Sequence, residues 1–271
     1  MELGLRGKVA VITGGSKNIG RHITEAFVSA GAHAIILYRS DDDATRAICR
    51  DIVSKGGSAD AYRVDLADAA AVQATAREII DKSGGVDVLI NNAAIRPNSR
   101  ISAITVDEWD AVFSTNLRSA FLLSQAFLPA MIDKGWGRIV NIGGLDAYWG
   151  KPCRAHNVSA KMGLVGLTRA LANEVARFGV TVNMVVPGTT DTYRHSPDWY
   201  PELDRFYEER KDRIPMGRLG MAHEVSRACL FLASDLASYT TAQELFVSGG
   251  AYPMVRQPAD EYPANEFRTL K

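Results

Sequence analysis

A glycine-rich segment with the spacing of a phosphate-binding turn lies near the start of the chain. It reads Thr13-Gly14-Gly15-Ser16-Lys17-Asn18-Ile19-Gly20 and stands between an apolar run at 9–12 and a helical pattern at 19–30. Glycines permit a tight turn and let a pyrophosphate approach the backbone, while the helix N-terminus offers free N–H donors and the positive end of its dipole. The segment therefore predicts a nucleotide-binding turn, with an ordinary tight turn as the alternative.

Two cations accompany this turn. Lys17 lies within it, and Arg39 follows the second apolar run, with Ser40 directly after. An acidic residue there would bind the ribose hydroxyls of NAD, whereas a guanidinium suits the 2′-phosphate of NADP. The aspartates at 41–43 admit another interpretation, in which they are the acidic residue of an NAD site displaced along the chain. Acidic residues also favour the start of a helix, and we place these three aspartates there. The residues favour NADP(H).

The elements that must position these groups alternate along the chain. Short apolar runs stand at 9–12, 34–38, 61–64, 86–90, 138–142, 180–186 and 245–247. Between them lie helical patterns at 19–30, 42–55, 68–82, 105–133 and 155–178. Apolar strands that alternate with helices predict an α/β fold: a doubly wound parallel sheet of Rossmann type with about seven strands. We expect a single domain over 1–250.

Two regions interrupt the alternation. Residues 189–215 are rich in Thr, Tyr, Pro and charge without a clean period, and we interpret them as a lid, since long irregular loops are often functional. Residues 251–271 carry three prolines after a pair of glycines and are interpreted as a C-terminal tail.

Composition excludes several classes of protein. The 271 residues carry 31 Lys and Arg against 31 Asp and Glu, a balance that argues against nucleic-acid binding. No apolar run approaches the ~20 residues of a membrane span. The three cysteines have no disulfide or Cys-x-x-Cys spacing, no cluster has metal-ligand spacing, and no Gly-x-Ser-x-Gly turn starts a hydrolase triad. We expect a cytoplasmic protein with no metal, nucleic-acid or membrane partner.

Several spaced motifs together resemble those of the short-chain dehydrogenase/reductase family over about residues 5–250. The family's Thr-Gly-x-x-x-Gly-x-Gly is matched at 13–20, except that Asn18 replaces the middle glycine. Asparagine tolerates left-handed backbone, so the turn can survive. Further matches are Asn91-Asn92-Ala93-Ala94, Asn116, Lys161, Pro187-Gly188 and Val247-Ser248-Gly249-Gly250.

The resemblance implies a set of cofactor-binding residues and an assembly. The residues are Gly14, Ser16, Lys17, Asn18, Ile19, Arg39, Ser40, Asp65, Leu66, Asn91, Ala93, Lys161, Pro187, Gly188, Thr190 and Thr192. Among them Asp65 resembles an adenine contact, Thr192 resembles a nicotinamide contact, and basic residues at 17 and 39 imply NADP(H). The family also implies a homotetramer, with one interface formed by the long helices at 105–133 and 155–178.

The catalytic positions depart from this pattern. The family's reaction uses a Ser at the end of the fifth strand and a Tyr-x-x-x-Lys, and this chain has Gly144 and Asn157 at the Ser and Tyr positions while Asn116 and Lys161 are retained. An amide donates a hydrogen bond but is no general acid near neutral pH. Candidates for the missing proton donor are Asp146, Tyr148, His156 and Lys161, although His156 and Tyr148 are also typical packing residues.

Three functions stay open at this point. The first is an oxidoreductase with a non-standard proton-transfer site that acts on a small carbonyl, imine or conjugated C=C substrate, as in the dienoyl-CoA reductase branch, which also lacks this Tyr. The second is a non-redox, lyase- or hydrolase-like enzyme on the same fold. The third is a catalytically silent nucleotide-binding subunit.

The substrate is expected beyond the carboxyl ends of the strands. Arg96 and Gly144 follow the fourth and fifth strands, and Tyr193 and Trp199 follow the sixth. Arg96 or Arg154 could anchor a carboxylate, with a surface cation as the alternative for each.

Overall fold

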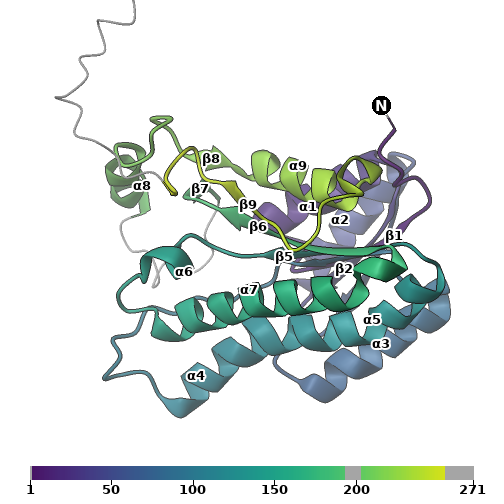
Figure 1. The fold of residues 1–271 in the computed structure, drawn as a ribbon, viewed down its shortest axis with the longest axis horizontal. Helices are drawn as coiled ribbons and strands as arrows, with labels where there is room; N and C mark the ends of the chain where they lie inside the picture. The colour runs from purple at the N-terminus through teal and green to yellow at the C-terminus, as the bar shows by residue number, and fades with distance from the viewer. Residues whose placement is uncertain (1, 193–202, 254–271) are drawn as a thin grey trace, which may run out of the picture.

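The computed structural model describes residues 2–192 and 203–253, and within these ranges seven strands form one parallel sheet. Their order across the sheet is β3-β2-β1-β4-β5-β6-β9 (Figure 1). The strands are β1 (Val9–Thr13), β2 (His33–Tyr38), β3 (Ser58–Arg63), β4 (Val88–Asn91), β5 (Gly137–Ile142), β6 (Val180–Pro187) and β9 (Glu244–Val247). The order reverses direction between β1 and β4, and this is where doubly wound sheets bind ligands. The prediction of fold class is confirmed.

Helices cover both faces of the sheet (Figure 1). One layer contains α3 (Ala69–Ser83), α5 (Ser119–Asp133) and α7 (Ala155–Val175), and the other contains α1 (Asn18–Ser29), α2 (Asp42–Ser54) and α9 (Ala222–Ala233). The remaining helices are α4 (Val106–Phe113), α6 (Asp146–Trp149) and α8 (Leu203–Lys211), and a small second sheet pairs β7 (Thr190–Asp191) with β8 (Gly220–Met221).

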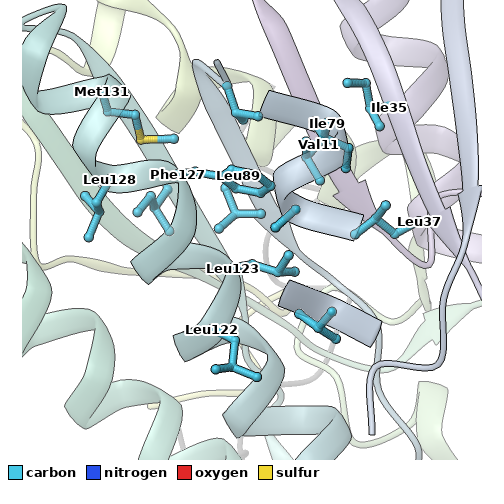
Figure 2. Close-up of a cluster of buried hydrophobic side chains, with 14 of the residues drawn as sticks. Val11, Ile35, Leu37, Ile79, Leu89, Leu122, Leu123, Phe127, Leu128 and Met131 are labelled. Atoms are coloured by element: carbon cyan, nitrogen blue, oxygen red, sulfur yellow. The ribbon is translucent and has the colours of Figure 1, made fainter. Parts of the chain in front are cut away.

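The inner strands β1, β2, β4, β5 and β6 are almost entirely buried because they lie between two cores, whereas the edge strand β3 is partly exposed. Val11 packs with α3 and α5 in the core shown in Figure 2, which includes Ile79 and Phe127. Its neighbours Ala10 and Ile12 point to the opposite face and join the core of α1, α2 and α9. Alternate side chains of a strand point to opposite faces, so a sheet covered on both sides buries nearly every position of its inner strands.

The long helix expected over 105–133 is interrupted. Residues Ser114–Arg118 form a turn of π-helix between α4 and α5. Such turns frequently occur at functional sites, and this one contains Asn116.

Helix α9 was not predicted, and α8 lies inside the segment expected to be an irregular lid. Helix α9 does have a helical apolar pattern, since Val225, Cys229 and Leu232 are buried. That pattern was the signal that could have found it. Within the described ranges, no helix is long and apolar enough to cross a membrane.

Candidate functional site

The glycine-rich turn joins β1 to α1 at the carboxyl edge of the sheet. Gly14 and Asn18 both have left-handed backbone, with φ of 64° and 49°. The expectation that asparagine sustains this turn is confirmed. A Cβ atom at Gly20 would lie 2.1 Å from the carbonyl oxygen of Gly14, so only glycine lets the helix start this close to the turn.

The loop after β4 is tied to the turn by hydrogen bonds. The Thr13 hydroxyl accepts the backbone N–H groups of Asn92 and Ala93 at 2.8 and 2.9 Å, and Asn92 Nδ2 donates to the Thr13 carbonyl at 2.9 Å. Asn91 instead donates to Asn141 Oδ1 at 2.8 Å between β4 and β5. Asn91 therefore holds two strands together, and its neighbour Asn92 lines the cleft.

One pocket lies at the ends of β1, β2 and β3. Of the residues expected to hold a cofactor, it contains Gly14, Ser16, Lys17, Arg39, Ser40, Asp65, Leu66 and Ala93. Lys17 forms an ion pair with Asp41, one of the aspartates for which the sequence favoured a place at the start of a helix over an NAD-type acidic signature. The pocket also has a wall that the sequence analysis did not identify, formed by Leu37, Val64 and Thr115.

A second pocket continues from the first, because Gly14, Lys17 and Ala93 line both. It contains the other expected cofactor residues apart from Asn91, namely Asn18, Ile19, Lys161, Pro187, Gly188, Thr190 and Thr192. The two pockets form a continuous cleft along the carboxyl ends of the strands, with the glycine-rich turn at its centre.

Lys161 lies at the far end of this cleft and is almost fully buried, with 5% of its surface exposed. Its Nζ donates to the Ile142 carbonyl at the end of β5. Burial, and then the positive charge of Arg96, lower the pKa of Lys161 to about 7. Since burial disfavours the charged form, the amine gains or loses its proton near neutral pH.

Asn157 lies one helical turn before Lys161 on α7 and is 2% exposed. Asn116 Nδ2 donates to Asn157 Oδ1 at 3.1 Å, and Asn116 is itself held by the backbone of Ile95. The described residues offer no acceptor to Asn157 Nδ2, which stays available as a donor.

A third pocket opens beyond Lys161. It brings together Arg96, Gly144, Asp146, Asn157 and Lys161, all of them predicted as catalytic or substrate residues. The pocket is also lined by Trp149, Lys151 and Arg210, which were not predicted as site residues from the sequence. Gly144 leaves open space, because a Cβ atom there would have no neighbour within 4 Å.

Other candidates lie elsewhere. The Tyr148 hydroxyl donates to Glu244, and the centroid of the Tyr148 ring lies 5.0 Å from that of Phe246. Burial and the hydrogen bond to Glu244 raise the pKa of the phenol. Tyr148 is therefore a packing residue. His156 is fully buried and contacts Glu108. Arg154 is buried at the start of α7. Tyr193 and Trp199 lie outside the described residues.

Three features define a dinucleotide-binding fold. They are the glycine-rich turn, the parallel sheet whose strand order reverses between β1 and β4, and the cleft along the carboxyl edge of that sheet. In the described ranges, no group of three or more His, Cys, Asp or Glu side chains could hold a metal ion.

Comparison with known proteins identifies the family. A family model described as enoyl-(acyl carrier protein) reductase matches residues 14–252. The chain belongs to the short-chain dehydrogenase/reductase family.

Curated relatives match over nearly their whole length. The 3-oxoacyl-[acyl-carrier-protein] reductase FabG of Aquifex aeolicus is 36% identical over 254 residues, covering 93% of this chain and 100% of the relative. FabG of Salmonella typhimurium is 37% identical over 255 residues, covering 92% and 99%.

Solved structures of NADP-bound oxidoreductases have the same fold as this chain. A gluconate 5-dehydrogenase from Burkholderia cenocepacia in complex with NADP and tartrate has a TM-score of 0.86 at 30% identity, covering 94% of this chain and 98% of the other. A 3-oxoacyl (acyl-carrier-protein) reductase from Agrobacterium tumefaciens with NADP bound has a TM-score of 0.84 at 32% identity, covering 91% and 95%.

Proposed function

We propose that this protein is an NADP(H)-dependent oxidoreductase with a non-standard proton-transfer site, acting on a small carbonyl, imine or conjugated C=C substrate. The observation that carries the proposal is the position of Lys161. This buried lysine lines both the dinucleotide cleft and the adjoining pocket of Asn157. A molecule in either pocket therefore contacts the same titratable amine.

The residues of the cleft fit NADP(H). Arg39 and Ser40 line the cleft just after β2, where a 2′-phosphate would lie, and Lys17 is the second cation there. The glycines of the turn admit a pyrophosphate at the start of α1. The NADP found in solved relatives supports the same cofactor.

When bound, NADP(H) supplies or accepts the hydride, and the chain's own residues handle the proton. Asn157 Nδ2 binds the substrate oxygen, since its Oδ1 is already paired with Asn116. The protonated amine of Lys161 delivers a proton to that oxygen, a transfer favoured by a pKa of about 7. In this way Asn157 and Lys161 replace the Ser and Tyr that the family resemblance leads one to expect at positions 144 and 157.

We place a lid at residues 189–215, of which 193–202 lie outside the described residues. Helix α8 lies within this segment and carries Arg210 into the pocket of Asn157. We place the catalytic domain at 1–250 and the tail at 251–271; residues 254–271 of the tail lie outside the described ranges.

A cytoplasmic homotetramer completes the proposal. Phe121 on α5 and Met162 on α7 are each 43% exposed, and such apolar side chains on two long helices suit a second copy of the chain. The thiols of Cys49, Cys153 and Cys229 are free, as a reducing compartment would keep them. Sedimentation of the purified protein should give the mass of four chains, and a monomer would contradict the assembly.

The test of function is NADPH consumption over a panel of ketones, imines and enones. Lys161→Met should lower the rate by about 100-fold or more, because a positioned acid contributes roughly that much. Lys55→Met, at the exposed residue that directly follows α2, is the matched control and should keep the rate. NADPH that binds but is never oxidised would refute the redox function, and failure to bind NADPH would refute the cofactor.

A further inference from the structure

The loop between β2 and α2 carries Arg39 and Ser40, which line the dinucleotide cleft. Its residues are 39–41, since β2 ends at Tyr38 and α2 begins at Asp42. Asp41, directly before α2, has left-handed backbone with φ of 69°, and its side chain caps no backbone N–H of the helix. Left-handed backbone is less favourable for an aspartate than for glycine, so contacts from outside the loop help to hold this conformation.

One such contact comes from Arg63, the last residue of β3. Arg63 is opposite Tyr38 in the register of β2 and β3, so the two strands end side by side. The Nε of Arg63 donates to the carbonyl oxygen of Arg39 at 3.2 Å, and its Nη1 lies 3.6 Å from Asp42 Oδ2. One guanidinium therefore contacts both the first residue of the loop and the first residue of α2.

These two contacts need the shape of an arginine. The donors of a guanidinium are spread over a rigid plane, whereas lysine presents a single nitrogen at the end of a flexible chain. A lysine at position 63 would keep the charge, but it would not hold the Arg39 carbonyl and the Asp42 carboxylate in the same way.

The contribution of Arg63 to stability is small. Its side chain is 66% exposed and that of Asp42 is 33% exposed, and ion pairs on a surface add little to the free energy of unfolding. Asp42 also keeps a second cation when Arg63 is removed, because Arg46 Nη2 lies 3.5 Å from its Oδ2. The consequence of losing Arg63 is therefore a change in the position of the loop.

We propose that Arg63 is a positioning residue for NADP(H), which holds the loop between β2 and α2 so that Arg39 and Ser40 face the 2′-phosphate. The inference rests on the proposed function and adds a residue that sets the preference for NADPH over NADH. The described lining of this pocket does not include Arg63, so Arg63 acts through the loop. NADH has no 2′-phosphate, and its binding does not depend on where the loop places Arg39.

The test measures the affinities of the full-length protein for NADPH and NADH by fluorescence titration. Arg63→Met should weaken NADPH binding by about tenfold, the cost of a misplaced charge-assisted contact, and should leave NADH binding unchanged. Arg63→Lys should weaken NADPH binding nearly as much, because it keeps the charge without the two contacts. Arg50→Met removes an exposed arginine of α2; it is the control and should change neither affinity.

A structural role and a role of charge alone give different results. The urea midpoint of Arg63→Met should equal that of the parent, since the pair is exposed. Equal losses for the two cofactors, or an unchanged affinity for NADPH, would overturn the inference. So would full NADPH affinity in Arg63→Lys, or a loss in Arg50→Met as large as in Arg63→Met.

The parent protein separates this inference from the proposed function. A parent that does not bind NADPH refutes the cofactor and, with it, the role of Arg63. A parent that prefers NADPH, and keeps that preference as Arg63→Met, refutes the role of Arg63 and leaves the proposed function standing.

Discussion

Asn116 Nδ2 donates a hydrogen bond to Asn157 Oδ1 at 3.1 Å, across 41 residues of chain. Asn116 is held in this orientation because its own Oδ1 accepts the backbone N–H of Ile95 at 2.9 Å. The π-helical turn at 114–118 presents Asn116 to both partners. The pairing decides which end of the Asn157 amide can donate to a substrate.

Asn116→Asp should therefore lower kcat and leave NADPH affinity unchanged. A carboxylate at 116 offers Asn157 Oδ1 no donor, so Asn157 turns its Nδ2 away from the substrate pocket. We expect kcat to fall by about tenfold or more, the cost of one lost hydrogen bond to a charged or reacting group. Steady-state kinetics and NADPH titration measure the two effects. Asn98→Asp, at an exposed loop position, is the control; an unchanged kcat in Asn116→Asp would contradict the role of the pair.

Lys161 should titrate near neutral pH in the protein without ligand. Its pKa lies at about 7, so raising the pH through that value removes the proton and slows reduction. NMR of 13C-labelled lysine should show one resonance with a midpoint near pH 7, well below that of ordinary lysine, and Lys161→Met should abolish it. Arg96→Gln removes a positive charge and should move the midpoint upward. A midpoint that stays near that of exposed lysines would show that the amine is charged throughout.

The fully buried His156 should stabilise the start of α7. Its Nδ1 accepts the backbone N–H of Asn157 at 2.8 Å, so the proton is on Nε2, which lies 2.8 Å from Glu108 Oε1. His156→Ala removes this cap and leaves a buried cavity, and we expect a loss of about 2–3 kcal/mol in the free energy of unfolding. Glu108→Gln keeps an acceptor and should lose less than about 1 kcal/mol. Urea unfolding compares the two, and equal losses would mean that the carboxylate charge matters more than the cap.

Arg39 and Asp41 should set the preference for NADPH in opposite directions. Arg39→Gln removes a cation from the adenosine end of the cleft, so NADPH affinity should fall by about tenfold and NADH affinity should stay. Asp41→Asn releases Lys17 from its ion pair and should bind NADPH more tightly, while asparagine tolerates the φ of 69° at this position. Fluorescence titration measures both, with exposed Asp43→Asn as the control. Equal changes for NADPH and NADH would argue against a 2′-phosphate contact.

Gly144 and its neighbour Gly143 should differ in their tolerance of a side chain. A Cβ atom at 143 would lie 2.8 Å from Met184 Sδ, whereas one at 144 would meet open space. Gly143→Ala should lose about 1–3 kcal/mol through overpacking, and Gly144→Ala should unfold at the same urea concentration as the parent. A large loss at 144 would mean that its backbone, and not the pocket, requires glycine.

The sequence was sufficient for the sheet. Strands such as β2 and β6 are recognisable because burial on both faces makes them mostly apolar, a property of consecutive residues. The glycine-rich turn was recognisable for the same reason, since φ of Asn18 and Gly14 depends on local backbone preference. Helix α9 was missed although its apolar spacing was present, and the π-helical turn was missed because residues 105–133 have no local signal that distinguishes it from a regular helix.

The chemistry of the site was decided by tertiary structure. The sequence by itself determined that Lys161 follows Asn157 by one helical turn. It offered Asp146, Tyr148, His156 and Lys161 as proton donors, although Tyr148 and His156 are also typical packing residues. Only the folded chain directs the Tyr148 hydroxyl to Glu244, which is 96 residues away, and buries Lys161 beside Arg96. A pKa depends on burial and on charges that are close in space, and neither is a property of neighbouring residues in the sequence.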